Sequence, residues 1–150
     1  MKLESYPSIS IVGATGAVGK ICLEILKEKN YPHEKIKLFA SKRSEGKKIK
    51  YFDQELLVHE ATKSSFHNSN VVFISADSSV SLDLAPSAVD SGALVIDDGS
   101  AFRMKEDVPL VVPEVNEEDI NYHKGIISIP NCTTTPLVMA IHNLKKLSPI

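Results

Sequence analysis

The sequence contains no tryptophan and only two cysteines, Cys22 and Cys132, among its 150 residues. So few cysteines supply no disulfide framework, which argues against a small, secreted, disulfide-stapled domain. Cys22 falls in a helical apolar pattern, and we expect it to be buried and structural. No apolar run approaches the roughly 18 residues of a membrane-spanning helix, and the N-terminus lacks the apolar segment of a signal peptide. These absences favour a cytoplasmic protein.

An excess of charge of either sign is also missing. The formal net charge is −2, from 17 basic and 19 acidic residues, so no basic field is present to bind nucleic acid or an anionic membrane. Hydrophobic residues make up 43% and charged residues 24% of the chain, which is typical of a folded globular domain. The length suits one domain with a real core. We therefore expect a small-molecule ligand rather than a nucleic acid or a membrane.

Short apolar runs alternate with helical patterns, which indicates parallel strands joined by crossover helices. We expect strands at 9–12, 37–40, 56–59, 71–75, 94–97, 110–112 and 126–129, with loops at 44–48 and 103–107. The runs at 71–74 and 94–96 are continuously apolar and should be central, covered on both faces. The predicted fold class is α/β, a Rossmann-type, mostly parallel sheet with helices on both faces.

Two helices are expected between these strands. The first follows the first strand and has one apolar face, made of Val18, Ile21, Cys22, Ile25 and Leu26. The second spans 79–91, with Pro86 near its first turn or at a kink because proline removes a helical hydrogen bond.

Three glycines follow the first predicted strand. Gly13, Gly16 and Gly19 stand between that strand and the first predicted helix. In this context glycines let the backbone approach a pyrophosphate at the positive end of the helix. The GxxGxxG spacing differs from the common GxGxxG, and a tight turn without a ligand would use the same residues. The order of strand, glycines and helix nevertheless favours a dinucleotide site.

The end of the second predicted strand indicates which dinucleotide would bind. An acidic residue there would bond to a ribose hydroxyl, whereas basic residues would bind a 2′-phosphate. The sequence has no acid at this point and instead reads Ser41, Lys42, Arg43 and Ser44. Two hydroxyls and two cations can surround a phosphate monoester with charge-assisted hydrogen bonds. The residues favour NADP over NAD, although a solvated polar turn has the same composition.

Cys132 lies where an apolar strand stops at Pro130 and a helix is predicted to begin. Free N–H groups and the positive end of the helix dipole favour a thiolate at such a place. With a dinucleotide nearby, the thiolate can add to an aldehyde carbonyl and the oxidised cofactor can remove a hydride, which leaves a thioester. Attack by phosphate would then release an acyl phosphate. Arg103 is a candidate anchor for that phosphate, because a guanidinium can hold it with two parallel hydrogen bonds. The alternatives are a packed Cys132 and a surface Arg103.

Five stretches together resemble the aspartate-semialdehyde dehydrogenase family. They are VGATGAVG from Val12, ASKRSEGK from Ala40, SAFR from Ser100, VPLVVPEVN from Val108 and IPNCTTTP from Ile129. These stretches span nearly the whole chain in the family's order. The resemblance implies NADP-dependent, reversible conversion of L-aspartyl-4-phosphate to L-aspartate 4-semialdehyde through a cysteine thioester, on the route to lysine, methionine and threonine.

The resemblance also implies roles for residues of this chain. Cys132 is the acyl-thioester nucleophile, and Arg103 binds inorganic phosphate or the acyl phosphate, with Asn131 in the same site. The residues placed around NADP are Gly13, Ala14, Thr15, Gly16, Ala17, Val18, Ser41, Arg43, Ser44, Ser75 and Ala76. One departure concerns Asp98, which stands where the family often has asparagine. A carboxylate there would weaken anion binding unless it points away.

In the family, a second domain carries the catalytic histidine, a glutamine, the arginine for the substrate carboxylate and most dimer contacts. The resemblance places that substrate and dimerisation domain beyond Ile150, so residues 1–150 correspond to an NAD(P)-binding Rossmann domain that ends with the nucleophile-bearing helix. The full-length protein is then expected to be a homodimer. The 150-residue chain is expected to bind NADPH weakly, with negligible turnover.

No histidine of the chain is expected to replace the missing base. His142 lies about 15 Å along the predicted helix axis from Cys132, beyond the hydrogen-bond reach of a general base. The other histidines lack the spacing of metal ligands, and no metal site is predicted. They are His33, His59, His67 and His123.

Three alternatives stay open at this point. N-acetyl-γ-glutamyl-phosphate reductase has a similar fold and thioester chemistry, but its cysteine usually follows Pro-Gly and precedes Tyr-Pro, unlike the Pro-Asn-Cys-Thr found here. A dinucleotide-binding module without catalysis would need only the glycine turn. An interaction module could use the helix at 137–147, whose apolar residues Leu137, Ala140, Ile141 and Leu144 would form an exposed patch.

Overall fold

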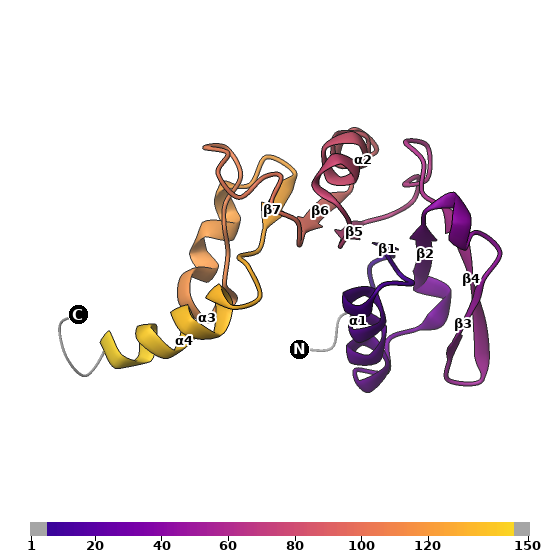
Figure 1. The fold of residues 1–150 in the computed structure, drawn as a ribbon, viewed down its shortest axis with the longest axis horizontal. Helices are drawn as coiled ribbons and strands as arrows, with labels where there is room; N and C mark the ends of the chain where they lie inside the picture. The colour runs from indigo at the N-terminus through magenta and orange to yellow at the C-terminus, as the bar shows by residue number, and fades with distance from the viewer. Residues whose placement is uncertain (1–5, 146–150) are drawn as a thin grey trace.

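The computed structural model describes residues 6–145, which form a seven-stranded sheet covered by helices (Figure 1). The strands are β1 (Ile9–Val12), β2 (Ile36–Ala40), β3 (Lys48–Tyr51), β4 (Gln54–Glu60), β5 (Val71–Ile74), β6 (Leu94–Asp97) and β7 (Ile126–Ser128). The α-helices are α1 (Ala17–Glu28), α2 (Ser78–Asp90), α3 (Pro113–Asn116) and α4 (Thr134–Lys145). Three short 3-10 helices are η1 (His33–Lys35), η2 (Lys42–Ser44) and η3 (Glu117–Tyr122).

The strands lie in the order β3-β4-β2-β1-β5-β6-β7 across the sheet. Every pairing is parallel except that of β3 with β4. The chain leaves β1 toward β2 on one side, whereas β5, β6 and β7 extend the sheet on the other side. The order therefore reverses between β1 and β5, and open α/β sheets bind ligands at the carboxyl ends of strands at such a point. The fold class predicted from the sequence is confirmed.

Neighbouring residues of the central strands face opposite sides of the sheet. Val12 packs in one buried cluster with Leu84 of α2, whereas Ile11 packs in a second cluster with Leu23 of α1. The two helices therefore cover opposite faces, as their positions in Figure 1 show. Right-handed crossovers produce this arrangement because the chain leaves β1 and β5 in opposite directions. Packing on both faces holds the carboxyl ends of the neighbouring strands β1 and β5 side by side.

The predicted strand at 110–112 is wrong. Leu110 makes only an isolated parallel bridge to Ser128, with one hydrogen bond on each side of it. Pro109 and Pro113 bracket this segment, and proline has no N–H with which to extend a ladder. The apolar run is nevertheless buried, since Val111 and Val112 are 3% and 4% exposed.

A second difference is the edge strand β3, which the sequence did not predict. Lys48 and Lys50 point outward while Tyr51 is buried, so the apolar signal of this strand is short and interrupted by charge. A tight turn with Phe52 at φ 52° joins β3 to β4. Lysines on an edge strand discourage pairing with other chains.

The predicted apolar face of the first helix is only partly correct. Leu23 and Gly19 are the buried residues of α1, whereas Val18, Ile21 and Ile25 are 42%, 53% and 50% exposed. Apolar periodicity identifies a stripe but cannot tell which of two adjacent stripes meets the sheet. The predicted second helix is confirmed as α2, and its Pro86 lies inside the helix rather than near its first turn.

Between residues 6 and 145, no helix is long and apolar enough to span a bilayer. The same residues contain no group of three or more histidine, cysteine or acidic side chains that could hold a metal ion. Of the helix predicted at 137–147, the first nine residues belong to α4, and Leu147 lies outside the described residues.

Candidate active site

The glycine turn brings three elements into backbone contact. Gly13 follows β1 with φ +89°, and a Cβ placed on it would lie 2.0 Å from the carbonyl oxygen of Ser75 at the end of β5. A Cβ on Gly19 of α1 would lie 2.3 Å from the carbonyl oxygen of Gly13. No side chain fits at either position, so both glycines are required for the strand ends and the helix to approach this closely.

The turn leaves the start of α1 open to an anion. Gly16 is the N-cap residue of α1 and provides no side-chain cap, so the first N–H groups of the helix have no partner within it. The N–H groups of Gly13 and Ala14 are used differently, because both donate to the carbonyl of Phe39 in β2 at 2.9 and 3.1 Å. The Gly16 N–H also belongs to the turn, since it donates to the Gly13 carbonyl at 2.9 Å. The N–H groups left available to a phosphate are therefore those of Thr15 and of Ala17 and Val18 in the first turn of α1.

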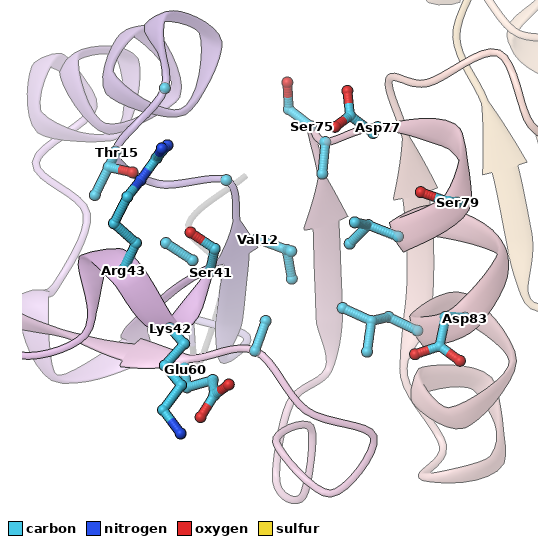
Figure 2. Close-up of a pocket in the computed structure, with 17 residues that line it drawn as sticks. Val12, Thr15, Ser41, Lys42, Arg43, Glu60, Ser75, Asp77, Ser79 and Asp83 are labelled. Carbon is cyan, nitrogen blue, oxygen red and sulfur yellow. The ribbon is translucent and has the colours of Figure 1, made fainter.

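An open pocket of about 910 Å³ lies at this edge, between the ends of β1 and β5. Its size is at the upper end of small-molecule pockets and suits a dinucleotide. Figure 2 shows it with residues of β1, η2 and β4 on one side and residues of β5 and α2 on the other. Of the predicted cofactor residues, it is lined by Gly13, Thr15, Gly16, Ser41, Arg43, Ser75 and Ala76.

Four predicted cofactor residues do not line this pocket. Ala14 is fully buried, and Ala17 and Val18 are exposed at the start of α1. Ser44 is 5% exposed, and its Oγ accepts from Thr15 Oγ1 and from Lys47 Nζ, each at 3.4 Å. Ser44 thus supports Thr15 from behind the pocket wall.

The cations predicted to bind a 2′-phosphate lie on η2, directly after β2. Ser41, Lys42 and Arg43 all line the pocket. In Figure 2 the Arg43 side chain extends beside Thr15, while Lys42 points away toward Glu60. The Arg43 guanidinium forms no ion pair with any residue between 6 and 145. Beside the Thr15 hydroxyl and the open end of α1, it gives this side of the pocket a positive charge suited to a phosphate monoester.

Sequence reasoning missed the acidic residues of the pocket. Glu60, Asp77 and Asp83 line it from β4, the turn after β5 and α2. Asp83 forms an exposed ion pair with Lys63 at 2.8 Å. The rule that ligands bind at the carboxyl ends of parallel strands could have identified Glu60 and Asp77, which end β4 and follow β5. The pocket therefore has Lys42 and Arg43 together with Glu60 on one side, and the carboxylates Asp77 and Asp83 on the other.

Arg103 is held by two backbone carbonyls rather than by an acid. Its Nε donates to Ile129 at 3.0 Å and its Nη2 donates to the carbonyl of Asp98 at 2.8 Å. No carboxylate of the described residues forms an ion pair with it. The half-buried guanidinium bridges the chain segments that follow β6 and β7 and retains N–H groups for an anion.

Cys132 lies in the turn between β7 and α4, two residues before the first helical residue. Asn131 organises this turn, since its Oδ1 accepts from the N–H of Thr133 at 2.9 Å and from the Thr133 hydroxyl at 2.8 Å. The Cys132 thiol also approaches that oxygen, at 3.7 Å. The thiol is exposed, so its interpretation as a packed core residue does not hold for the described chain.

Cys22 is half-buried against the α1 side of the core. Burial raises the pKa of its thiol, which lowers its reactivity at neutral pH.

Asp97 is the last residue of β6, Asp98 follows it, and the two carboxyl groups lie in different environments. Asp97 is fully buried, and its Oδ1 accepts from Ser81 Oγ at 2.6 Å. Burial raises the pKa of Asp97, although the hydrogen bonds from Ser81 and Gly99 favour the charged form. Asp98 is half-buried, and its Oδ2 accepts from Ser75 Oγ at 2.9 Å. The Asp98 carboxylate is thus directed to the end of β5 and forms no ion pair with Arg103 in the described structure.

Known proteins are similar in sequence to this chain. The family described as semialdehyde dehydrogenase, NAD binding domain, matches residues 8–123. The aspartate-semialdehyde dehydrogenase of Bacillus subtilis (strain 168) is 50% identical over 138 residues, which are 92% of this chain and 40% of the relative. The Synechocystis enzyme of the same name is 44% identical over 142 residues, or 95% of this chain and 42% of the relative. The chain spans about two fifths of the length of these curated relatives.

Solved structures share the fold. The Vibrio cholerae aspartate semialdehyde dehydrogenase II complexed with ASA superposes with a TM-score of 0.89 at 37% identity, over 95% of this chain and 47% of that chain. The Candida albicans aspartate semialdehyde dehydrogenase with NADP gives a TM-score of 0.79 at 30% identity, over 95% and 48%.

Proposed function

The chain belongs to the semialdehyde dehydrogenase family, whose NAD-binding domain it contains, and from that membership we propose that it forms the cofactor and nucleophile half of an aspartate-semialdehyde dehydrogenase. One observation carries the proposal. At the carboxyl edge of a single sheet, a glycine turn opens a pocket of dinucleotide size and a second turn exposes Cys132. The proposed reaction is reversible reductive dephosphorylation of L-aspartyl-4-phosphate to L-aspartate 4-semialdehyde.

NADP is the proposed form of the cofactor. The family establishes a dinucleotide domain, and the cations on the η2 side of the pocket support the 2′-phosphorylated form. Arg43 and Lys42 line the pocket where an acid would be needed to bind the unmodified ribose. The Candida albicans relative, which has the same fold, was solved with NADP. Thr15 and Gly16 would contact the pyrophosphate at the open end of α1.

The proposed chemistry uses the thiolate of Cys132 as nucleophile. Its sulfur attacks the acyl carbon of the acyl phosphate, a C–S bond forms, and the C–O bond to phosphate breaks. The thioester carbon then accepts a hydride, which bound NADPH supplies, and the C–S bond breaks to give the aldehyde and the thiolate. Arg103 would hold the phosphate through its free N–H groups, and the Asn131 side-chain amide would donate to the same anion.

The proposal also covers the rest of the protein. Residues 1–150 would be the NAD(P)-binding Rossmann domain, and a substrate and dimerisation domain with the general base would correspond to the part of the relatives that this chain does not span. We include in this proposal a homodimer, aspartate semialdehyde and phosphate as the small-molecule partners, and a cytoplasmic location.

A chimera tests the proposed reaction. We would join this chain to the part of the Bacillus subtilis relative beyond the matched segment and measure NADP⁺ reduction with aspartate semialdehyde and phosphate. The expected result is phosphate-dependent turnover that Cys132→Ser abolishes and the matched variant Cys22→Ser leaves intact. Turnover that survives Cys132→Ser would reject the thioester mechanism, and a folded chimera without turnover would reject the proposed activity.

The alternatives receive less support. Both curated relatives described above are aspartate-semialdehyde dehydrogenases, which does not favour N-acetyl-γ-glutamyl-phosphate reductase. A dinucleotide-binding module without catalysis would not need an exposed thiol at Cys132, three residues after the carbonyl that accepts from Arg103.

A further inference from the structure

Asp98 lies between the dinucleotide pocket and the arginine of the anion site. Its side chain accepts from Ser75 Oγ at 2.9 Å, and Ser75 lines the pocket. Its backbone carbonyl accepts from Arg103 Nη2 at 2.8 Å, and its N–H donates to the carbonyl of Ile74 at 2.8 Å. Main-chain and side-chain bonds therefore fix this residue on three sides, which makes its orientation a property of the fold.

The bond to Asp98 determines what the Ser75 hydroxyl can offer to a ligand. An ionised carboxylate accepts hydrogen bonds and cannot donate them, so the single hydroxyl proton of Ser75 is directed toward Asp98. Only lone pairs of the Ser75 oxygen are left to face the pocket. In this arrangement Ser75 accepts from a ligand N–H group and repels a phosphate oxygen.

The charged side chains of the pocket are also divided between its two sides. Arg43 and Lys42 lie on the side of η2, with Glu60 beside Lys42, whereas Asp77 lies beside Ser75 in Figure 2 and Asp83 lies farther along α2. Phosphate groups are favoured on the first side and disfavoured on the second. A dinucleotide has a phosphate-rich adenosine half and a nicotinamide half whose carboxamide carries an NH₂ donor.

We propose that Asp98 is a positioning residue for the dinucleotide, because it makes the Ser75 hydroxyl an acceptor for the nicotinamide carboxamide. The adenosine half then lies toward Arg43 and the nicotinamide half toward the end of β5, on the side where Arg103 and Cys132 follow β6 and β7. This inference rests on the proposed function, since it requires a dinucleotide in the pocket of Figure 2.

Binding of two probes to the 150-residue chain tests the inference without any turnover. NADP⁺ contains both halves, whereas adenosine 2′,5′-bisphosphate contains the adenosine half alone. We would measure the dissociation constant of each probe by calorimetry for the unchanged chain and for Asp98→Ala, Asp98→Asn, Ser75→Ala and the double variant Asp98→Ala with Ser75→Ala.

Asp98→Ala is expected to weaken NADP⁺ binding about three- to tenfold, as for loss of one oriented hydrogen bond, and to leave adenosine 2′,5′-bisphosphate unaffected. Asp98→Asn should retain binding within about twofold, because its amide oxygen also accepts the Ser75 proton. Ser75→Ala should lose as much as Asp98→Ala, and the double variant should lose no more than either.

Two results would overturn the inference. Unchanged NADP⁺ binding by Asp98→Ala would mean that the Ser75 orientation does not matter. Equal weakening of both probes would mean that Asp98 shapes the pocket as a whole and not its nicotinamide end. If the unchanged chain is folded by circular dichroism and binds neither probe, the proposed function itself fails, and the inference fails with it.

Discussion

The chain uses one structural device twice, a parallel strand followed by a tight turn and a helix N-terminus, and the two copies differ in their surroundings. At the first, after β1, the turn packs against β2 and β5, and Gly13 touches the carbonyl of Ser75. At the second, after β7, the residues from Asn131 to Thr134 are all exposed. We call these the glycine junction and the cysteine junction.

This difference indicates that the chain completes the cofactor-binding half of the proposed site but not the catalytic half. The glycine junction has walls on both sides and opens one pocket. The cysteine junction has its nucleophile and one arginine, but no wall opposite them in the described structure. The helix that follows also has exposed apolar residues, since Leu137, Ile141 and Leu144 are 58%, 40% and 53% exposed. Cofactor binding should therefore belong to this chain alone, whereas turnover should require further residues.

The most damaging change at the glycine junction should be Gly13→Ala. An added methyl would lie 2.0 Å from a backbone carbonyl that cannot move aside, at a φ of +89°. We expect dinucleotide binding to weaken by about a hundredfold or more, measured by calorimetry. Gly92→Ala is the matched control, because Gly92 has φ +88° but an added methyl there would meet no atom within 4 Å. Equal losses in the two variants would show that backbone strain, not close approach, matters.

Arg43→Ala should separate the two forms of the cofactor. Loss of a charge-assisted hydrogen bond should weaken NADP⁺ binding roughly 10- to 100-fold, while NAD⁺ binding should change little. Lys42→Ala is the comparison, since Lys42 lines the same wall but points away from Arg43 in Figure 2. If Arg43→Ala weakened NAD⁺ and NADP⁺ binding alike, the assignment of this wall to a 2′-phosphate would be wrong.

Much of the glycine junction could be predicted from the sequence because its determinants are local. The strand, glycines and helix that surround Gly13 are consecutive, and local order is what a sequence pattern records. The acidic residues of the pocket could not be found this way, since Glu60 and Asp77 line the same pocket only after strands distant in sequence have paired. The hydrogen bond between Ser75 and Asp98 depends on the same pairing.

The errors have similar causes. The apolar run at 110–112 resembles a strand, but its neighbours Pro109 and Pro113 limit its pairing. The stripe of Val18, Ile21 and Ile25 has helical spacing, but tertiary packing places Leu23 against the sheet instead. Local patterns thus predicted which elements form, and long-range packing decided which faces they bury.

The cysteine junction can be compared with the rest of the chain through its thiol. Cys132 is exposed, whereas Cys22 is half-buried and burial raises its thiol pKa. We expect iodoacetamide at pH 7.5 to modify Cys132 on the order of tenfold faster than Cys22, as followed by mass spectrometry of peptides. Faster modification of Cys22 would show that the second junction is covered in solution.

The smallest expected effect concerns Asp97, the last residue of β6. This strand lies in the sheet between β1 and β7, after which the two junctions follow. Burial raises the folded pKa of Asp97 above the usual 3.8, so the folded state holds a proton that the unfolded state loses. Its contribution to stability is present below that value and is lost as pH rises through the folded pKa. Above pH 4, the free energy of unfolding of Asp97→Asn should fall less steeply with rising pH than that of the unchanged chain. Urea titration at several pH values measures this. An unchanged pH profile would contradict this.

The central claim is that residues of this chain complete the dinucleotide site, and titration of the 150-residue chain with NADPH tests it most directly. The account predicts saturable fluorescence with one site per chain, competition by adenosine 2′,5′-bisphosphate, and binding by Gly13→Ala that is weaker by about a hundredfold or more. A chain that is folded by circular dichroism yet shows no saturable binding would contradict the claim, because the pocket at the glycine junction would then be insufficient for the cofactor.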